Sequence, residues 1–398
     1  MNKETSQLIH VLKTICGEAE PKKPILLHEP KLNDSTTREY VNDCLESGWV
    51  SSAGEWVKRF EERICLITNS PSAVAVTNGT VGLRLGLHVL GVDQGDEVIT
   101  SPLSFVATAN AISHLGAIPH FVDIESNSLS MCPDALEERL EEIAVRVDNY
   151  TVNKKTNRKI TAILPVHIFG RVGNIERIVQ IAHKWNIRVL EDAAEALGSW
   201  KNDKHCGLIG DAGVISFNGN KIVTTGGGGI LISKDTSLME RARYISTTAK
   251  KAHPWEYEHT EIGWNDRMPN INAALGCAQL DKLSEILRKK RKLHDKYMNE
   301  IKNITNIELL ADDSGVKSNH WLNAIRLKDE NDKDAEKKRN EILEVCNANG
   351  YMIRPCWKPM HSFDMYRQCP RGEVKQTERQ YKRVINLPSS PQLLKSNV

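Results

Sequence analysis

The chain has 398 residues, 40% of them hydrophobic, so it can bury a core larger than that of one ordinary domain. Its 53 basic and 51 acidic residues nearly cancel to +2, which excludes the strongly basic footprint of a nucleic-acid binder. The nine cysteines form no C-x-x-C pair and no apolar run reaches about 18 residues, so we expect no disulfide framework, no metal site and no membrane span.

The first predicted element is an amphipathic helix near the N-terminus, where Leu8, Leu12 and Ile15 recur at helical spacing. This helix is too short and too polar for a signal peptide or a membrane span. We therefore describe residues 1–25 as an N-terminal helical segment and expect a cytoplasmic protein.

From about residue 73, short apolar runs alternate with longer helical stretches. Strands that alternate with helices of this length indicate an α/β fold with a mostly parallel sheet and helices on both faces. Two later runs, 213–217 and 229–233, flank a glycine-rich turn and are expected to complete a seven-stranded sheet as an antiparallel pair. The other predicted strands are 73–76, 97–100, 121–123, 162–165 and 187–190, and the helices lie near 83–90, 107–114, 134–143 and 174–185.

The second half of the chain has longer, more charged helical patterns. Residues 26–255 are assigned to a large domain and residues 256–398 to a smaller α+β domain. Within the small domain we expect one long helix over 270–298, a strand over 321–327 and a helix over 334–347. In the large domain, the polar stretch 148–159 is predicted to be an exposed loop.

Polar residues gather where the predicted parallel strands end, which is where ligands bind in open α/β sheets. Gly79 and Thr80 follow the first strand and open a helix, whose free N–H groups favour a phosphate. Asp192 ends another strand, and Ser216 and Lys221 flank the turn after a third. Each residue alone has a simpler explanation as a cap, a turn residue or a solvated lysine. Together they indicate a phosphorylated cofactor with a protonated ring nitrogen.

The same positions belong to longer motifs that follow one another along the chain. The motifs are Trp49 to Gly54 with Phe60-Glu61, Thr77-Asn78-Gly79-Thr80, Ser101 to Thr108, Glu191-Asp192-Ala193-Ala194-Glu195, Ser216 to Lys221, Gly263 to Met268 and Ala273 to Gly276. In this order, over roughly residues 25–390, they resemble the DegT/DnrJ/EryC1/StrS family of sugar aminotransferases. The resemblance implies a fold-type-I enzyme dependent on pyridoxal 5′-phosphate (PLP), a homodimer with active sites at the interface, and L-glutamate as the amino donor.

The resemblance also implies a role for each matching residue. Lys221 would hold PLP as a Schiff base and later move a proton, with pyridoxamine 5′-phosphate as the intermediate cofactor form. Asp192 would pair with the protonated pyridine nitrogen, and Phe105 would stack on the ring. Glu195 stands near the ring hydroxyl where many members have glutamine, which leaves its role open. The phosphate would be bound by Gly79, Thr80 and Ser216, with Asn265 reaching it from the partner subunit.

Three further motifs bear on the sugar. Lysine rather than histidine at 221 favours amine transfer over the dehydration branch of the family. The segments 218–229, 28–30 and 354–361 resemble a subgroup acting on UDP-linked 4-keto-6-deoxy-2-acetamido sugars. The expected product is UDP-4-amino-4,6-dideoxy-N-acetylglucosamine, made from UDP-2-acetamido-2,6-dideoxy-hexos-4-ulose for bacillosamine- or legionaminic-type glycans such as an O-antigen. GDP-4-keto-6-deoxymannose, as in perosamine synthesis, or a dTDP-sugar is the alternative.

Candidate contacts to the substrate rest on side-chain chemistry. Arg267 and Arg354 suit a donor carboxylate or a diphosphate, because the guanidinium fork binds either group with two hydrogen bonds, but surface ion pairs remain an equal alternative. His320 and His361 either contact the nucleotide sugar or pack the small domain. The full set of candidate substrate-binding residues is His28, Ser52, Arg267, His320, Arg354 and His361.

Two other function classes were weighed. A nucleotide-sugar oxidoreductase or epimerase needs a glycine fingerprint after the first strand, and the only early turn is 78–80. An inactive family member acting as a sensor has no need of Lys221 and Asp192 together. The sequence therefore favours a PLP-dependent nucleotide-sugar aminotransferase.

Overall fold

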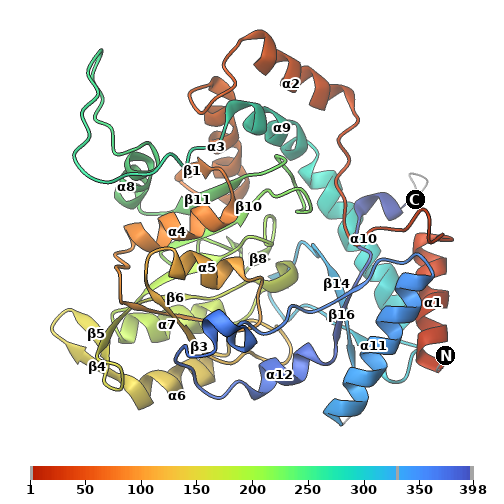
Figure 1. Ribbon diagram of the computed structural model, residues 1–398. Coiled ribbons are helices and arrows are strands. Elements are labelled where there is room, and N and C mark those ends of the chain that lie inside the picture. The colour runs from red at the N-terminus through yellow and green to blue at the C-terminus, as the bar shows by residue number, and fades with distance from the viewer. Residues whose placement is uncertain (1–2, 329–330, 395–398) are drawn as a thin grey trace.

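A mixed central sheet is the layer on which the chain is built (Figure 1). The computed structural model describes residues 3–328 and 331–394. The five neighbouring strands from β10 (Ala212–Ser216) to β3 (Ile118–Phe121) pair in parallel. Strand β11 (Gly229–Ser233) is antiparallel to both β1 (Ser72–Val76) and β10. The predicted α/β class, the seven-strand path and the antiparallel pair are confirmed. The strand order is β1 (Ser72–Val76), β11 (Gly229–Ser233), β10 (Ala212–Ser216), β7 (Arg188–Asp192), β6 (Arg158–Leu164), β2 (Glu97–Thr100) and β3 (Ile118–Phe121).

Two apolar clusters lie on opposite faces of this sheet. In β1, Val74 and Val76 belong to one cluster and Ala73 and Ala75 to the other, because successive side chains of a strand point to opposite faces. Both faces are buried, which is why the strands read as continuous apolar runs. One face is covered by α4 (Gly79–Val89), α5 (Ala107–Ser113) and α8 (Thr236–Ser246), and the other by α3 (Glu55–Thr68), α6 (Pro133–Ile143), α7 (Ile175–Lys184) and α9 (Asn270–Leu280).

The polar stretch 148–159 is not the exposed loop that its composition predicts. It contributes β5 (Tyr150–Asn153), which pairs with β4 (Ala144–Val147) and β6 and widens the sheet to nine strands. The side chain of Asn153 is buried and donates to Glu97 Oε2 at 2.9 Å. The prediction of a loop is therefore wrong. The sequence misleads here because a polar residue that is buried against a polar partner adds no apolar residue to the pattern.

The predicted long helix over 270–298 is two helices, α9 and α10 (Leu283–Ile301), separated at residues 281 and 282. Asp281 is held by other elements there, since its carboxylate accepts from Arg63 at 2.7 Å and from the Tyr40 hydroxyl at 3.0 Å. The apolar periodicity continues on both sides of the break, so the pattern predicts one helix.

The C-terminal region has its own sheet, in the order β12 (Ile307–Leu309), β14 (Asn323–Leu327), β16 (Val384–Leu387) and β15 (Arg354–Pro355). The N-terminal amphipathic helix is confirmed as α1 (Lys3–Cys16). Its Leu8 and Leu12 share an apolar cluster with Leu293 and Tyr297 of α10 and with α11 (Asp332–Ala348). No helix in the described ranges is long and apolar enough to cross a membrane. The remaining elements are α2 (Ser35–Glu46), β8 (Trp200–Lys201), β9 (Lys204–His205), β13 (Val316–Lys317), α12 (Lys375–Tyr381) and the 3-10 turns Ile168–Gly170, Met360–Ser362, Asp364–Tyr366 and Pro391–Leu393.

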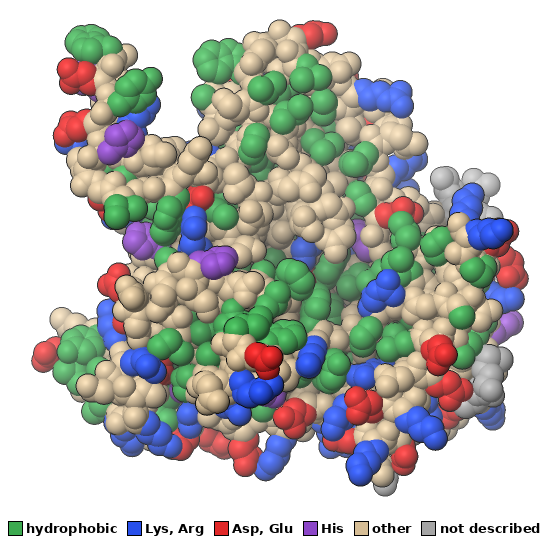
Figure 2. Space-filling model, viewed as in Figure 1, with side chains coloured by type: hydrophobic (Ala, Val, Ile, Leu, Met, Phe, Trp, Pro, Cys, Tyr) green, Lys and Arg blue, Asp and Glu red, His purple; other side chains and the backbone are tan. Residues whose placement is uncertain are grey.

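Between α8 and α9 the chain leaves the body as an extended arm, residues 248–263 (Figure 1). Figure 2 shows apolar side chains on this arm, beside an open notch in the surface. Trp255, Tyr257 and Ile262 are 75%, 79% and 89% exposed. Such exposed apolar side chains on a projecting segment are typical of a surface that another molecule covers.

Candidate active site

A cavity of about 310 Å³ opens where β7 and β10 end. It is the place at which ligands bind in doubly wound sheets. Seven of the eight predicted cofactor-binding residues line it, namely Gly79, Thr80, Phe105, Asp192, Glu195, Ser216 and Lys221. The fold therefore brings together residues spread over more than 140 positions of the chain, from 79 to 221.

One end of the cavity is built from the start of α4. Asn78 caps this helix by accepting the N–H of Val81 at 2.9 Å, and the N–H groups of the first turn have no partner within the helix. A Cβ on Gly79 would lie 3.0 Å from Cβ of Ser216, a tight contact, so the glycine eases the close approach of β10. A Cβ on Gly229 would lie 2.6 Å from the Asn78 carbonyl oxygen. This cradle of backbone donors and a serine suits a phosphate.

Gly229 is a residue whose importance sequence reasoning missed. From the sequence alone, the four glycines at 226–229 indicate only a tight turn. The signal that was available is the position of the last glycine, which begins a strand that pairs with β1, directly beneath the turn that opens α4.

Asp192 is the last residue of β7 and also lines the cavity. It is 4% exposed, and its carboxylate accepts the Thr108 hydroxyl at 2.8 Å and the Ala194 N–H at 3.2 Å. Burial raises the pKa of Asp192 above its ordinary value, and the Thr108 hydrogen bond opposes that rise. A buried carboxylate of this kind gains most from a cationic N–H partner.

Lys221 extends into the cavity from the loop that follows β10. Its Nζ lies 3.1 Å from Glu195 Oε1 and 4.1 Å from the centre of the Trp321 ring. Glu195 is buried, which raises its pKa, while the charge of Lys221 acts in the opposite sense. Trp321 also lines the cavity.

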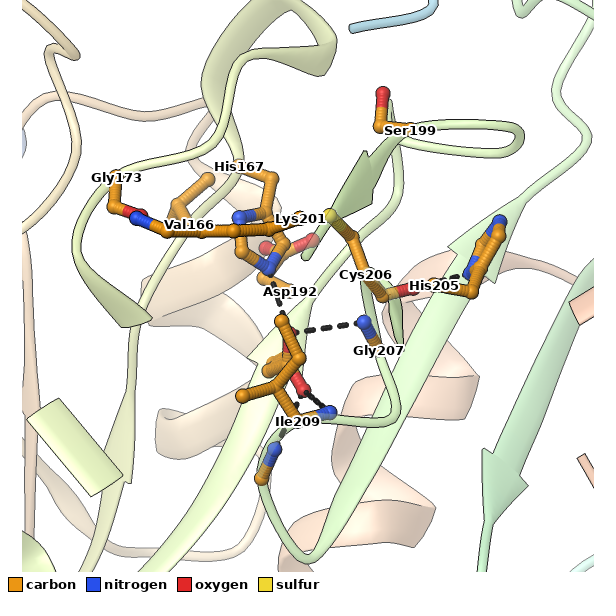
Figure 3. A network of polar contacts seen from close by, with 12 residues as sticks. Val166, His167, Gly173, Asp192, Ser199, Lys201, His205, Cys206, Gly207 and Ile209 are labelled. Atoms are coloured by element: carbon orange, nitrogen blue, oxygen red, sulfur yellow. Dashed lines mark hydrogen bonds and ion pairs between the residues drawn. The ribbon is translucent and has the colours of Figure 1, made fainter. Parts of the chain in front are cut away.

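Behind Asp192 lies a second polar network that sequence reasoning did not identify (Figure 3). Glu191 is fully buried and accepts N–H groups from Gly207 at 2.8 Å and from Ile209 and Gly210 at 2.7 Å each. Its Oε2 also lies 2.7 Å from Nε2 of His167. A glutamate inside an otherwise apolar strand run was the available signal.

Three of the remaining predicted residues lie apart from the cavity. Asn265 is not among the described residues that line the cavity. It forms an antiparallel bridge with Thr247 near the base of the arm. Arg267 is buried against Glu61, with 2.8 Å between its Nη2 and Oε1 of the carboxylate. Ser52 is exposed in the turn before α3.

Two others, His28 and Arg354, line a second cavity of about 580 Å³. This cavity shares Asn220, Trp321 and Trp357 with the Lys221 cavity, so the two adjoin. Neither ring nitrogen of His28 makes a well-formed hydrogen bond within the described residues.

The last two predicted residues, His320 and His361, are buried. The His320 ring stacks on His294 at 4.0 Å, and burial lowers the pKa of His320 to about 2. His361 Nε2 lies 3.5 Å from the Glu378 carboxylate. Within the described part of the chain, neither is among the residues that line the two cavities.

The comparison with known proteins identifies the class to which this site belongs. The model of the DegT/DnrJ/EryC1/StrS aminotransferase family matches residues 31–398. The chain belongs to this family. Among its relatives are GDP-perosamine synthases from Vibrio cholerae, 33% identical over 94% of this chain and 96% of the relative, and from Escherichia coli O157:H7, 34% identical with the same coverage.

Solved structures agree with the family assignment. The aminotransferase TlmJ from Streptoalloteichus hindustanus superposes with a TM-score of 0.83 at 26% identity, covering 94% of this chain and 95% of that one. Spr1654 from Streptococcus pneumoniae, solved in its PLP form, has a TM-score of 0.80 at 26% identity and the same coverage. The expected family, fold and PLP dependence are confirmed, and the protein is a PLP-dependent nucleotide-sugar aminotransferase.

The residues present fit this cofactor. The start of α4 could hold its phosphate, the buried carboxylate of Asp192 could pair with its pyridinium nitrogen, and Lys221 lines the same cavity. The alternative of an oxidoreductase or epimerase has no support from the family, and the inactive-sensor alternative is set aside with it.

Proposed function

We propose that Lys221 is the residue that binds PLP covalently and that Asp192 pairs with its pyridinium N–H. The observation that carries this proposal is the convergence of seven predicted cofactor residues on one cavity. Gly79, Thr80 and Ser216 hold the phosphate, and Phe105 covers a face of the ring. Glu195, which the family resemblance places near the ring hydroxyl of PLP, also contacts the amine of Lys221.

Each of these side chains has a distinct task. PLP, when bound, supplies an electron-withdrawing ring that stabilises negative charge on the adjacent substrate carbon. Asp192 keeps the ring nitrogen protonated, because its buried carboxylate is stabilised by the positive charge. The amine of Lys221 takes a proton from the substrate carbon and returns it. The tryptophans at 321 and 357 exclude water from that proton transfer.

We propose that the amino group passes from L-glutamate to C4 of a nucleotide-linked 4-keto-6-deoxy sugar. The relatives named GDP-perosamine synthase support the alternative acceptor, GDP-4-keto-6-deoxymannose, better than the UDP-linked acetamido sugar that the motifs predict. The UDP-linked candidate is retained for one reason. His28 and Arg354, which belong to its motifs, line the cavity that adjoins Lys221.

We further propose a homodimer in which each subunit completes the other's cavity. Phe105 is 54% exposed although it lines the cavity, so one side of the site is open to a neighbouring chain. Asn265 is exposed at the base of the arm, in a place from which it can serve a partner. The apolar side chains of the arm suit burial at such an interface.

Two measurements test the assignment. The purified protein is expected to be yellow, and borohydride is expected to fix a pyridoxyl group on Lys221, located by peptide mass spectrometry. A colourless protein, or label on another lysine, would refute the cofactor site.

For the sugar, the protein is incubated with L-glutamate and a panel of GDP-, UDP- and dTDP-linked 4-keto-6-deoxy sugars, and products are identified by NMR. We expect GDP-perosamine from the GDP-linked substrate. Turnover confined to the UDP-linked acetamido sugar would contradict the GDP assignment and leave the cofactor site intact.

A further inference from the structure

The amine of Lys221 lies close to two other side chains. Glu195 Oε1 lies 3.1 Å from Nζ, and the centre of the Trp321 ring lies 4.1 Å from it. An ammonium group is stabilised by both a carboxylate and an aromatic face. The Trp321 indole N–H also donates to the carbonyl of Asn220 at 2.8 Å, which fixes the ring against the loop that bears the lysine.

A single asparagine fixes the two walls relative to each other. Asn319 is 1% exposed, and its amide donates to the backbone carbonyl of Glu195 at 2.8 Å. Its side-chain oxygen accepts the N–H of Trp321, also at 2.8 Å. The carbonyl of Trp321 in turn accepts from the buried amino group of Lys290 at 2.9 Å. The carboxylate and the ring are therefore built into place around Lys221, not left free on a surface.

The two oxygens of Glu195 differ in their surroundings. Oε2 accepts the backbone N–H of Phe169 at 2.7 Å, so this oxygen is an acceptor in any protonation state. Oε1 faces the amine of Lys221. A proton added to the carboxylate is therefore placed on Oε1, the oxygen from which Lys221 can take it back.

The electrostatic surroundings of Glu195 favour its neutral form more than water does. Its side chain is buried, which raises its pKa, and the nearby carboxylate of Asp192 acts in the same direction. The thiol of Cys356 is a further titratable neighbour, and Lys221 is the cation that opposes the rise. Transfer of a proton to Glu195 is therefore easier here than to a carboxylate in water.

We propose that Glu195 is a catalytic residue that accepts a proton from the ammonium of Lys221 and later returns it, with Trp321 as a positioning residue beside the amine. In the forward step an N–H bond of Lys221 breaks, an O–H bond forms at Oε1, and the electron pair stays on Nζ. The neutral amine of Lys221 would then be able to react with the aldehyde that PLP supplies, with water as the leaving group. This inference rests on the proposed role of Lys221, and it goes beyond the contact to the ring hydroxyl that the family resemblance implies.

The test uses the apoprotein and follows the rate at which PLP attaches to Lys221, by absorbance, from about pH 6 to pH 8. In the parent the Lys221–Glu195 pair retains its proton, so the rate depends little on pH. In Glu195→Gln the ammonium must lose its proton to solvent, so the rate rises by about tenfold per pH unit. Glu176→Gln, which removes a carboxylate bound to Lys201 at 3.4 Å, is the control. The ratio of variant to parent rates cancels the titration of PLP itself.

A second readout does not depend on rates. The infrared difference spectrum between loaded and apoprotein is expected to contain a protonated-carboxyl band that is missing from Glu195→Gln. Equal pH profiles for parent and variant, a slope confined to the parent, or the same infrared spectrum in both would overturn the proposal. Borohydride labelling is run on both proteins. Label on Lys221 with equal profiles rejects only the role of Glu195, whereas label elsewhere rejects the cofactor site.

Discussion

Replacement of Glu191 by glutamine is expected to destabilise the protein strongly, although the two side chains have the same shape. The carboxylate of Glu191 accepts three backbone N–H groups and lies 2.7 Å from a ring nitrogen of His167. A glutamine has one oxygen. If that oxygen serves the N–H groups of Ile209 and Gly210, the amide NH₂ faces the Gly207 N–H, donor against donor.

The magnitude follows from the hydrogen bonds that the substitution removes. Hydrogen bonds to a charged group contribute about 1.5–3 kcal/mol each, and glutamine can replace only two of the four that Glu191 makes. Loss of the other two hydrogen bonds is therefore expected to cost about 3–6 kcal/mol. With about 2.1 cal/mol/K of unfolding entropy per residue, 398 residues give roughly 0.8 kcal/mol/K, so the melting temperature is expected to fall by about 4–7 °C.

The pH dependence provides a sharper check. Burial alone would raise the pKa of Glu191, but hydrogen bonds from His167, Gly210 and Gly207 outweigh it and the pKa lies below the ordinary value of 4.5. A carboxylate with a lowered folded-state pKa contributes stability that is complete above pH 4.5 and is lost as the pH falls through the folded value. The difference between parent and variant should therefore be constant at neutral pH and shrink below pH 4.5.

The assay is thermal unfolding at fixed protein concentration and fixed PLP loading, because ligand binding adds its own stability. Glu373→Gln is the control, since Glu373 is exposed and its ion pair with Lys375 contributes little. A melting temperature no lower than that of the control would refute the reasoning. So would a difference that persists unchanged at low pH, because it would not come from the charge of Glu191.

Three other outcomes are expected. Asp192→Asn should lower turnover by about 10²–10³-fold while circular dichroism stays that of the parent, and near-parental turnover would refute its role. Gly229→Ala should weaken PLP retention, because the added Cβ would lie 2.6 Å from the backbone of Asn78, just before α4. Gly227→Ala is the control and should retain PLP, because the atom nearest to its added Cβ is 3.8 Å away. Equal retention by the two variants would count against the cradle. Mixing Lys221→Ala and Asn265→Ala subunits should restore about a quarter of parental activity, since half of the dimers then hold one intact site, and no recovery would argue against shared sites.

The sheet was predictable because its strands are buried on both faces, so each appears as an apolar run bounded by turns. The β4–β5 hairpin was not predictable, because its sequence is polar and contains no apolar run. Asn153 is buried by pairing with Glu97, and burial of that kind leaves a polar sequence. The break between α9 and α10 was also hidden, because it depends on side chains from α2 and α3 that hold Asp281.

In the active site, the residues found from sequence are those that end a strand or follow one within a few residues. Asp192 and Lys221 stand at fixed places relative to β7 and β10, and the parallel order of those strands brings their ends together. Trp321 lies 100 residues after Lys221 and belongs to the other sheet region, so no local pattern connects the two. The contact between Lys221 and Trp321 can be found only from a structure in which the two regions pack against each other.

Glu195 shows how far a sequence departure can be interpreted once geometry is added. The family resemblance implies glutamine at this position in many members, whereas this chain has glutamate, and either residue can accept a hydrogen bond. The structure separates the two cases, because one oxygen is committed to the Phe169 N–H and the other faces the lysine amine. A glutamine in that place can orient the amine but cannot take its proton. The departure therefore concerns proton transfer at Lys221 rather than packing, and the pH profile of cofactor attachment is where the two residues should differ.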